Sequence, residues 1–372
     1  MADTVDNRLP MSPDTGDMRP RPSGATGLRP ASRDDRDQPP GSDDPGRRRL
    51  SPPAAGARPG PRARAGAFIR RHRLAPYLLL LPSFVAIGLV LVWPTIQVGM
   101  LSFQNYGLGQ LSGSLPTQWV GLSNFTTILT DPEFWLALRI TVVFAAVVVT
   151  LTLLTGTLVG LLLHNLGRGM ATFVSSAALL AWATPVVSAS VVFFWLFSPD
   201  GGLVDWTLSK LPHWLGGGAH WAGFNWTTSG ALPAYTVLTF IVVWMGFPFI
   251  AVTVLAGLKT IPAELVDAAR VDGAGPWRSF WRITYPLMRP IFLVLLLLSI
   301  IWDFGIFTQT YLITGQLGNR DEYNLSIYAY DKAFTMPPSY GIGAALALVL
   351  TVILLIITVG YVRASVRQGA TS

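Results

Sequence analysis

Residues able to do chemistry are sparse in this chain of 372 residues. There is no cysteine, which excludes disulfides, thiolate metal sites and cysteine nucleophiles. His213 and His220 lie in one loop without a convincing carboxylate partner, so the pattern disfavours a metal site. A phosphate-binding loop requires G-x-x-x-x-G-K-[ST], and the nearest match, Gly257–Thr260, has a leucine directly before its lysine. We therefore predict that the chain is not an enzyme and binds no cofactor, ATP and magnesium included.

The richest polar stretch runs from Glu264 to Pro290 and holds four Arg, two Asp and one Glu between long apolar runs. Pro262 suits the first turn of a helix, where its missing N–H costs nothing. Glu264 and Asp267 place negative charge near the helix N-terminus, where the helix dipole favours it. These positions predict a short helix within a polar loop that we place at residues 259–290.

The same stretch predicts where that helix ends. Ala268 and Ala269 give it a small, flat surface, and Gly273, after Asp272, can take the positive φ that terminates a helix. A second short helix after Pro276 would place three aromatic side chains on one face, namely Trp277, Phe280 and Trp281. The pattern is typical of two helices lying against a membrane surface, and it fits an interfacial loop as well as a docking element.

Asp303 is an acid inside an otherwise apolar run, LSIIWDFGIFTQTYLIT. A charge at the middle of a membrane helix costs about 2.5–3.5 kcal/mol on insertion scales, so such residues face a bundle interior or a wet cavity. Asp303 is either a hydrogen-bond partner for a neighbouring helix or part of a ligand path. Aromatic faces beside amide and hydroxyl groups suit a sugar, and five neighbours provide them: Trp302, Phe304, Phe307, Gln309 and Thr310.

The elements that position these residues are membrane helices. The chain is 51% hydrophobic and only 13% charged, with a mean hydropathy of +0.46. Apolar runs of about 20 residues, the length that crosses a bilayer, recur throughout. The predicted spans are 75–102, 140–163, 171–197, 232–258, 291–314 and 341–362. Membrane strands would alternate apolar and polar residues, and VVFAAVVVTLTLL does not. We predict an all-α integral membrane protein of about six spans.

The first 65 residues differ from the rest. They are rich in Pro, Gly, Arg and Asp, with almost no large apolar side chains, and such a segment cannot offset its ordering entropy. We predict a disordered cytoplasmic tail at 1–65, a membrane domain at 70–362 and a short cytoplasmic tail at 363–372. A nucleic-acid or lipid-binding arm is the alternative for the arginines of the tail. The preferred interpretation is that these arginines orient the chain in the membrane, so no nucleic-acid partner is expected.

Charge also predicts orientation. Residues 1–73 hold 15 Arg and 9 Asp, and basic segments stay on the cytoplasmic side. With six spans, the same side carries Arg168, Lys259, Arg270, Arg278, Arg282, Arg289, Arg363 and Arg367. The other side carries Arg139, Lys210, Arg320 and Lys332. The bias predicts a multi-pass protein of the cell membrane with both termini in the cytoplasm.

The pattern I-P-x-x-L-x-D-A-A-x-x-D-G-A-G-P-W, followed by I-T-x-P-L-x-x-P, resembles the EAA loop of binding-protein-dependent ABC importers. The resemblance is greatest to the sugar-permease branch typified by the maltose-transporter permease. It places the EAA triplet at Asp267, Ala268 and Ala269, with Asp in place of the family's Glu, and the loop glycine at Gly273. Two further segments agree: WMGFP at Trp244–Pro248 resembles the fourth-span pattern, and GLSNFTTILTDPEFWLAL at Gly121–Leu138 resembles the segment before the second span.

This resemblance implies a role for both polar stretches. The loop would be the coupling helix that docks on a cytoplasmic ATPase, through Pro262, Glu264, Asp267, Ala268, Ala269, Asp272 and Gly273. The candidate substrate path would be formed by Trp244, Gly246, Phe247, Trp302, Asp303, Phe304, Phe307 and Gln309. Partners would be a second permease subunit of different sequence, two ATPase subunits that bind ATP and magnesium, and an external substrate-binding protein.

The expected function is therefore a permease subunit that forms the path for a sugar or oligosaccharide. Another small polar solute, such as a glycerol phosphate, is the alternative within the family. A secondary transporter would need an ion-coupling site and usually inverted repeats, and the sequence has no visible internal repeat. A membrane glycosyltransferase would need converging acids or a metal motif in an outer loop, and none is visible.

Overall fold

The computed structural model describes residues 75–314 and 320–369. Every element below belongs to the unit Leu74–Ser372. The segment 1–65, predicted from its composition to be disordered, lies outside the described residues.

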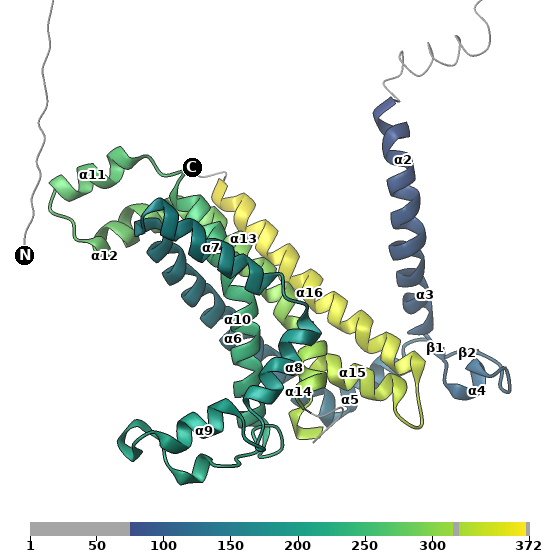
Figure 1. Cartoon of the computed structure of the whole chain (residues 1–372). Helices are drawn as coiled ribbons and strands as arrows, with labels where there is room; N and C mark the ends of the chain where they lie inside the picture. Colours follow the sequence, from purple (N-terminus) through teal and green to yellow (C-terminus); the bar gives the residue numbers. More distant parts are fainter. Residues whose placement is uncertain (1–74, 315–319, 370–372) are drawn as a thin grey trace, which may run out of the picture. The chain divides into compact units, whose positions relative to one another are not determined.

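Within the described residues, helices joined by short loops dominate (Figure 1). The α-helices are α2 (Ala75–Ile87), α3 (Trp93–Leu101), α4 (Leu108–Leu111), α5 (Ser123–Thr130), α6 (Pro132–Asn165), α7 (Arg168–Trp182), α8 (Val186–Leu196), α9 (Leu203–Lys210), α10 (Ala231–Leu258), α11 (Ala263–Val271), α12 (Pro276–Ser279), α13 (Tyr285–Phe304), α14 (Thr308–Ile313), α15 (Leu325–Phe334) and α16 (Tyr340–Gly369).

Shorter segments complete the described chain. The 3-10 and π turns are η1 (Gly88–Val92), η2 (His213–Leu215), η3 (Ala219–Trp221), η4 (Phe280–Thr284) and η5 (Arg320–Glu322). Strand β1 (Gln104–Asn105) pairs antiparallel with β2 (Gln118–Trp119), and Gln104 lies opposite Trp119. The predicted all-α fold class is confirmed.

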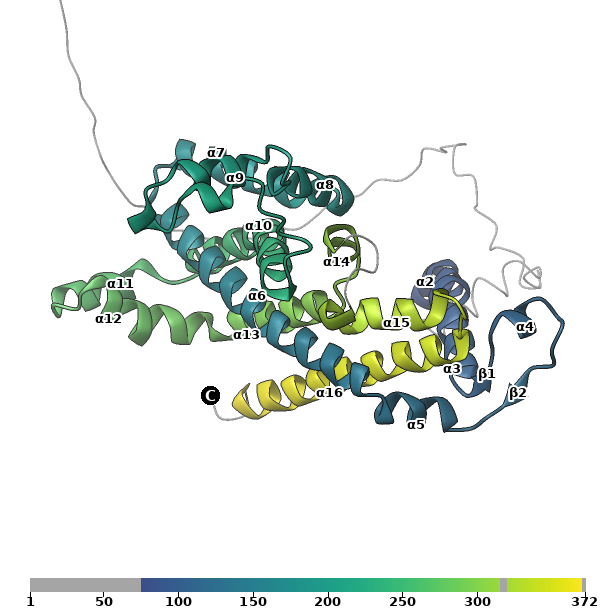
Figure 2. The same cartoon turned by 90° about the horizontal axis from the view of Figure 1, so that it is seen from below.

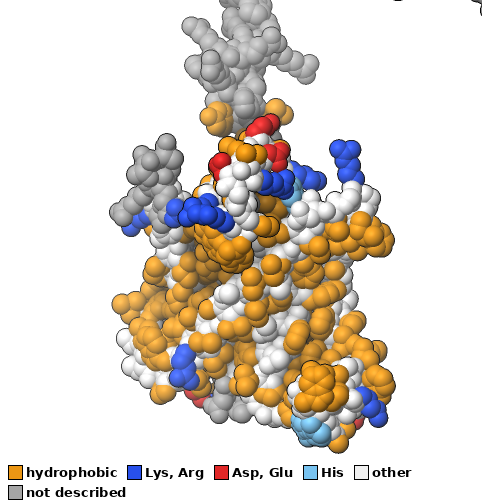
Figure 3. Space-filling view, turned by 90° about the vertical axis from the view of Figure 1, so that its left-hand side faces the viewer, with side chains coloured by type: hydrophobic (Ala, Val, Ile, Leu, Met, Phe, Trp, Pro, Cys, Tyr) orange, Lys and Arg blue, Asp and Glu red, His pale blue; other side chains and the backbone are white. Residues whose placement is uncertain are grey.

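Five helical segments of the described residues are long and apolar enough to cross a membrane, and the α7–α8 pair makes a sixth if it counts as one span. The five are Leu79–Leu101, Pro132–Asn165, Ala231–Leu258, Pro276–Phe304 and Tyr340–Arg363. Charged side chains gather towards the two ends of the molecule, and the surface between them is mostly hydrophobic (Figure 3). This distribution is the one that a bilayer requires.

The third predicted span, 171–197, is not one straight helix. α7 and α8 meet at an angle of 95° across a break of three residues. Pro185 has extended backbone angles, and a proline both lacks an N–H and pushes the preceding residue, Thr184, away from helical conformation. Hydropathy alone does not register this bend, because both halves are apolar.

The fifth predicted span, 291–314, is displaced along the chain. The observed segment begins at Pro276 and ends at Phe304. Pro290 lies inside α13 without ending it. Beyond Phe304 the backbone turns, and the amide of Asn324 donates to the carbonyl of Ile306 at 2.9 Å and to Thr310 Oγ1 at 3.0 Å. Asp303 therefore lies in the last turn of a helix rather than at the middle of a span.

Helices α6 and α10 form the central pair, and their contact is the most extensive in the described chain (Figures 1 and 2). Thr152, Gly156 and Gly160 recur every four residues along α6, which places them on one face. A Cβ built on Gly156 would lie 2.5 Å from the Cβ of Ile250, and one built on Gly160 would lie 2.8 Å from Val254 Cγ1. Small residues let membrane helices approach closely, and here they set the position of α10.

Candidate functional site

The polar loop has the helix–turn–helix form that the sequence predicts. α11 begins directly after Pro262, which occupies the N-cap, and Glu264 lies in its first turn. Gly273 has φ of +77°, and the amide of Ala274 donates to the carbonyl of Ala269 at 2.9 Å. Glycine adopts this left-handed backbone at no steric cost. The predicted end of the helix at Gly273 is confirmed.

α11 presents an apolar strip with acids beside it. Ala269 is buried, whereas Leu265 and Val271 are exposed, and 88% of Val271 is accessible. Ala268 and three acids on the same helix and its end are also exposed, namely Glu264, Asp267 and Asp272. Asp267 pairs with Arg270 one turn later at 2.9 Å. Of the two predicted surface alanines, only Ala268 is available for docking.

A second candidate site forms where three helices meet. Trp182 at the end of α7 stacks on Phe249 of α10, with ring centroids 5.6 Å apart. Phe249 in turn meets Trp302 of α13 edge-on at 5.5 Å. Trp182 and Trp302 each remain about half exposed within the described chain. The three rings thus form a continuous aromatic surface with open faces.

Asp303 follows Trp302 in this arrangement. It is 8% exposed, and no hydrogen bond or ion pair engages its carboxylate within residues 75–314 and 320–369. Ser299, one turn earlier on α13, is also buried. A buried acid without a protein partner is suited to hydroxyl groups of a ligand.

The other predicted path residues lie apart from this aromatic surface. Trp244 packs edge-on against Phe193 of α8 at 5.5 Å. Gly246 faces Thr152 of α6, and the carbonyl of Phe247 faces Gly156. Phe304 is buried. Phe307 stacks on Tyr311 at 5.3 Å, while Gln309 is half-buried. Trp302 is thus part of the three-ring surface, Asp303 follows it along α13, and the remaining six are placed in helix contacts or beyond the break at Gly305.

Residues 153–368 match the family model described as "Binding-protein-dependent transport system inner membrane component". The chain belongs to this family. It is the membrane component of a binding-protein-dependent transport system, a multi-pass inner-membrane permease and not the ATPase of that system. The resemblance carried by the Ile261–Trp277 loop is confirmed, since that loop lies within the matched residues.

Curated relatives match most of the permease. The diacetylchitobiose uptake system permease protein DasB of Streptomyces coelicolor is 42% identical over 83% of this chain and 91% of its own length. The sulfoquinovosyl glycerol transport system permease protein SmoG of Agrobacterium fabrum is 32% identical over 78% of this chain and 90% of its own length.

A solved structure shares the fold. The structure described as a bacterial ABC transporter involved in the import of the acidic polysaccharide alginate superposes with a TM-score of 0.67, at 22% sequence identity. The match covers 82% of this chain and 99% of the other. At this identity the likeness supports the fold of the permease.

Two residues of the three-ring surface, Trp182 and Phe249, were not among the residues predicted from the sequence. Trp182 lies shortly before Pro185, and Phe249 lies two residues after Phe247. The only local signal is a proline within three residues of each: Pro185 after Trp182, and Pro248, which lies inside α10, before Phe249. They meet where α7 packs against α10, a contact between segments far apart in the sequence.

At the end of the permease opposite α11, an ionic cluster joins α6 to α15. Tyr328 Oη donates to Asp131 Oδ2 at 2.6 Å, and Lys332 Nζ donates to the same oxygen at 3.1 Å. The amide of Glu133 donates to Asp131 Oδ1 at 2.9 Å. Burial raises the pKa of Asp131, but the bonds from Tyr328, Glu133 and Lys332 outweigh it, so the pKa is lowered overall. The cluster holds the start of α6 against α15.

Proposed function

We propose that the permease forms the membrane path for a small, neutral oligosaccharide. Two observations carry this proposal: the aromatic surface of Trp182, Phe249 and Trp302, and the buried, unpartnered carboxylate of Asp303, which follows Trp302 along α13. Sugar rings present C–H faces that stack on aromatic side chains, and their hydroxyls donate to a carboxylate. The curated relatives support the carbohydrate class, because DasB is named for a disaccharide and SmoG for a glycoside.

Coupling to ATP hydrolysis would occur through α11. Its exposed strip, Leu265, Ala268 and Val271, is short and bordered by acids, which suits insertion into a cleft of a partner. The basic residues near α11 support a cytoplasmic position for the end of the permease that carries α11, and for both termini of the chain. ATP and magnesium would bind to two separate ATPase subunits. Closure of these subunits would move α11 and bias the helices between two access states.

The remaining partners follow from the proposed path. A substrate-binding protein outside the membrane would deliver the sugar, and a second permease subunit of different sequence would supply the facing half of the path. The exposed apolar side chains of α2 and η1 require cover by lipid or by such a subunit.

The proposal is tested with the purified complex in lipid vesicles. Labelled diacetylchitobiose, trehalose and maltotriose are offered in turn, together with the binding protein and with ATP inside the vesicles. We expect uptake of at least one of these neutral sugars that stops when ATP is omitted. Uptake by vesicles that contain this chain alone would contradict the proposal, because it would indicate a secondary transporter.

The role of Asp303 is tested by Asp303→Ala. We expect normal membrane insertion and assembly but about tenfold lower uptake at a limiting sugar concentration, since hydrogen bonds to a charged group are lost. Asp205→Ala is the matched control. Asp205 is also a buried acid, but its Oδ1 accepts from Trp226 Nε1, so its loss should lower the melting temperature rather than sugar affinity. If the Asp303 variant takes up sugar at the wild-type rate, Asp303 has no role in the sugar path.

A further inference from the structure

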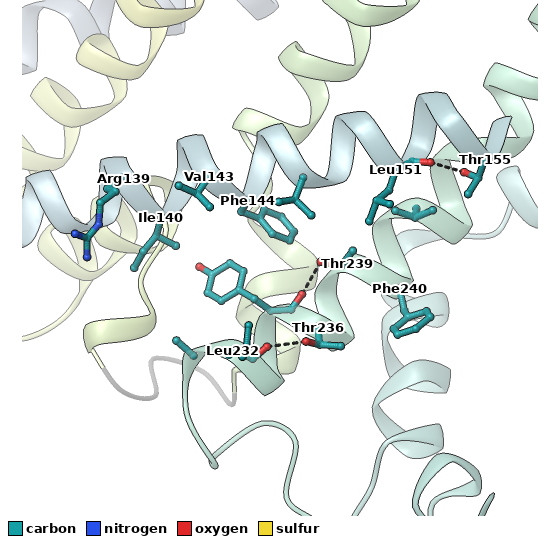
Figure 4. Close-up of a pocket in the computed structure, with 14 residues that line it drawn as sticks. Arg139, Ile140, Val143, Phe144, Leu151, Thr155, Leu232, Thr236, Thr239 and Phe240 are labelled. Carbon is teal, nitrogen blue, oxygen red and sulfur yellow. Dashed lines mark hydrogen bonds between the residues drawn. The ribbon is translucent and has the colours of Figure 1, made fainter. Parts of the chain in front are cut away.

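A long groove lies along the contact between α6 and α10, on a side of these helices that the aromatic surface does not use. It has a volume of about 750 Å³, and α6 and α10 contribute all of its lining. Figure 4 shows Arg139 at one end and Thr155 towards the other. None of Trp182, Phe249, Trp302 and Asp303 lines it. The groove is therefore separate from the proposed sugar path.

The lining offers almost no polar recognition, although it includes three threonines. Thr155 Oγ1 donates to the carbonyl of Leu151 at 2.6 Å. Thr236 and Thr239 donate to the carbonyls of Leu232 and Tyr235 at 2.8 and 2.7 Å (Figure 4). Tyr235 Oη is also engaged, as it donates to the carbonyl of Glu322 at 2.9 Å. With its hydroxyls satisfied within the protein, the groove suits a hydrocarbon chain and not a sugar.

The exception is Arg139, the charged member of the lining. Its side chain is exposed, and no hydrogen bond or ion pair to it occurs in the described part of the chain. The acids nearest to it along α6 are already paired, since Lys332 binds Asp131 and Glu133, and Arg320 binds Glu133 at 3.1 Å. A free guanidinium at the mouth of an apolar groove is complementary to a phosphate attached to a hydrocarbon tail.

The dimensions agree with a lipid in one leaflet. Arg139 lies seven residues after Pro132, or about 10 Å along α6, and Thr155 lies about 24 Å beyond Arg139 at 1.5 Å per residue. One leaflet of hydrocarbon is about 15 Å thick. The groove is thus long enough for an acyl chain when Arg139 lies at the headgroup level. The first turn of α10, with Ala231 and Leu232 in the lining, starts at the same end and adds the positive end of a helix dipole.

We propose that this groove binds one anionic phospholipid, with its phosphate on Arg139 and an acyl chain between α6 and α10. A zwitterionic lipid is less suited, because Asp131 and Glu133 are engaged and leave no acid of α6 for its ammonium group. The bound lipid fills the gap beside the α6–α10 contact. It thereby supports the helix pair that carries Phe249.

The test uses the assembled complex in detergent, incubated with phosphatidylglycerol or phosphatidylcholine of matched acyl chains. Native mass spectrometry counts the retained lipids. We expect the wild type to prefer phosphatidylglycerol over phosphatidylcholine. In Arg139→Gln this preference should be about tenfold smaller, because one charge-assisted hydrogen bond is lost. Arg320→Gln is the matched control, because it removes a cation from the same end but not from the groove. Equal preference in Arg139→Gln and wild type overturns the assignment of the phosphate.

A second pair of variants tests the acyl chain. Val147 lines the groove, whereas Val142 on the same helix does not, and both are about half exposed. Val147→Trp should displace the retained phosphatidylglycerol and Val142→Trp should keep it. Equal retention in both overturns the proposal. So does cross-linking of a Val143→Cys variant, in a chain without other cysteines, to another subunit, since this result would place protein in the groove.

Discussion

At the scale of single residues, Gly273 has the most defined role. Its φ of +77° ends α11, and a Cβ at this position would meet no atom within 4 Å. The position therefore tolerates a side chain sterically, and the cost of substitution is in the backbone conformation, about 1–2 kcal/mol for an ordinary residue. Asn and Asp enter this conformation more readily than other residues. Comparing these two substitutions therefore isolates the effect of the added charge from the effect of backbone strain.

We predict that Gly273→Asp uncouples the complex while Gly273→Asn retains most of its activity. The two side chains have the same shape, but Asp adds a third negative charge beside Asp272 and Asp267 at the docking surface. The measurement is ATP hydrolysis stimulated by the sugar-loaded binding protein, with copurification of the ATPase as the assembly control. Normal stimulation of ATP hydrolysis in Gly273→Asp would show that this turn is not part of the surface that docks on the ATPase.

At the scale of elements, close packing between α6 and α10 sets where the aromatic residues of α10 lie. A Cβ on Gly160 would lie 2.9 Å from the backbone carbonyl oxygen of Ala251. Backbone cannot yield as a flexible side chain can, so α10 must shift or tilt to admit even a methyl group. The glycines of α6 are thus packing residues, and Gly246 of α10 has a related position against Thr152.

Gly160→Ala should lower the stability of the complex by about 1–3 kcal/mol, the usual cost of overpacking. Gly169→Ala in α7 is the control, because a Cβ there meets nothing within 4 Å. Alanine has the higher helix propensity, so the control should melt at the same temperature or slightly higher. The check is thermal melting of the detergent-solubilised complex, and the idea fails if the two variants melt together.

The contact of α6 with α15 predicts a defined pH dependence. Because the pKa of Asp131 is lowered in the folded protein, the cluster stabilises the fold above the unfolded pKa of about 3.9 and loses this contribution as pH falls through the folded pKa. Asp131→Asn should therefore melt earlier than wild type by a constant margin from about pH 5 to about pH 8. The margin should shrink only below about pH 4. A margin that changes near neutral pH would contradict this account.

At the scale of the whole molecule, the permease combines a membrane unit with a long N-terminal segment of different composition. The membrane unit, Leu74–Ser372, contains the polar loop with α11, the aromatic surface and the groove between α6 and α10. The segment 1–65 lies outside the described residues, and its predicted disorder depends on its composition alone: many Pro, Gly, Arg and Asp residues with almost no large apolar side chains.

Deletion of residues 2–60 should leave assembly and ATP-dependent uptake largely intact, because a segment of this composition has no means of packing into a core. Residues 70–73, which include three of the arginines that favour the cytoplasm, are retained in this variant. Uptake and copurification of partner subunits are compared with those of the full chain. Failure of the truncated chain to assemble would show that the tail has a structural role.

Local properties of the sequence determined much of this protein. Long apolar runs predict membrane helices because a backbone in lipid must satisfy its own hydrogen bonds. Asp-Gly-Ala after an alanine-rich helix predicts the turn at Gly273 because only the glycine is free of the left-handed penalty. The loop pattern also predicted the family. In each case the deciding interactions involve neighbours in the sequence.

Tertiary structure alone decided the rest. Just beyond the end of α13 at Phe304, the carbonyl of Ile306 accepts from the side-chain amide of Asn324, 18 residues further along the chain, and hydropathy does not report such a partner. Trp182 reaches Phe249 because α7 packs against α10, a contact between segments far apart in the sequence. Apolar helices are hydrophobic on all sides, so their sequences do not reveal which face meets a neighbour and which meets lipid. The choice is made by shape, where Gly156 and Gly160 admit α10 and leave a groove beside it.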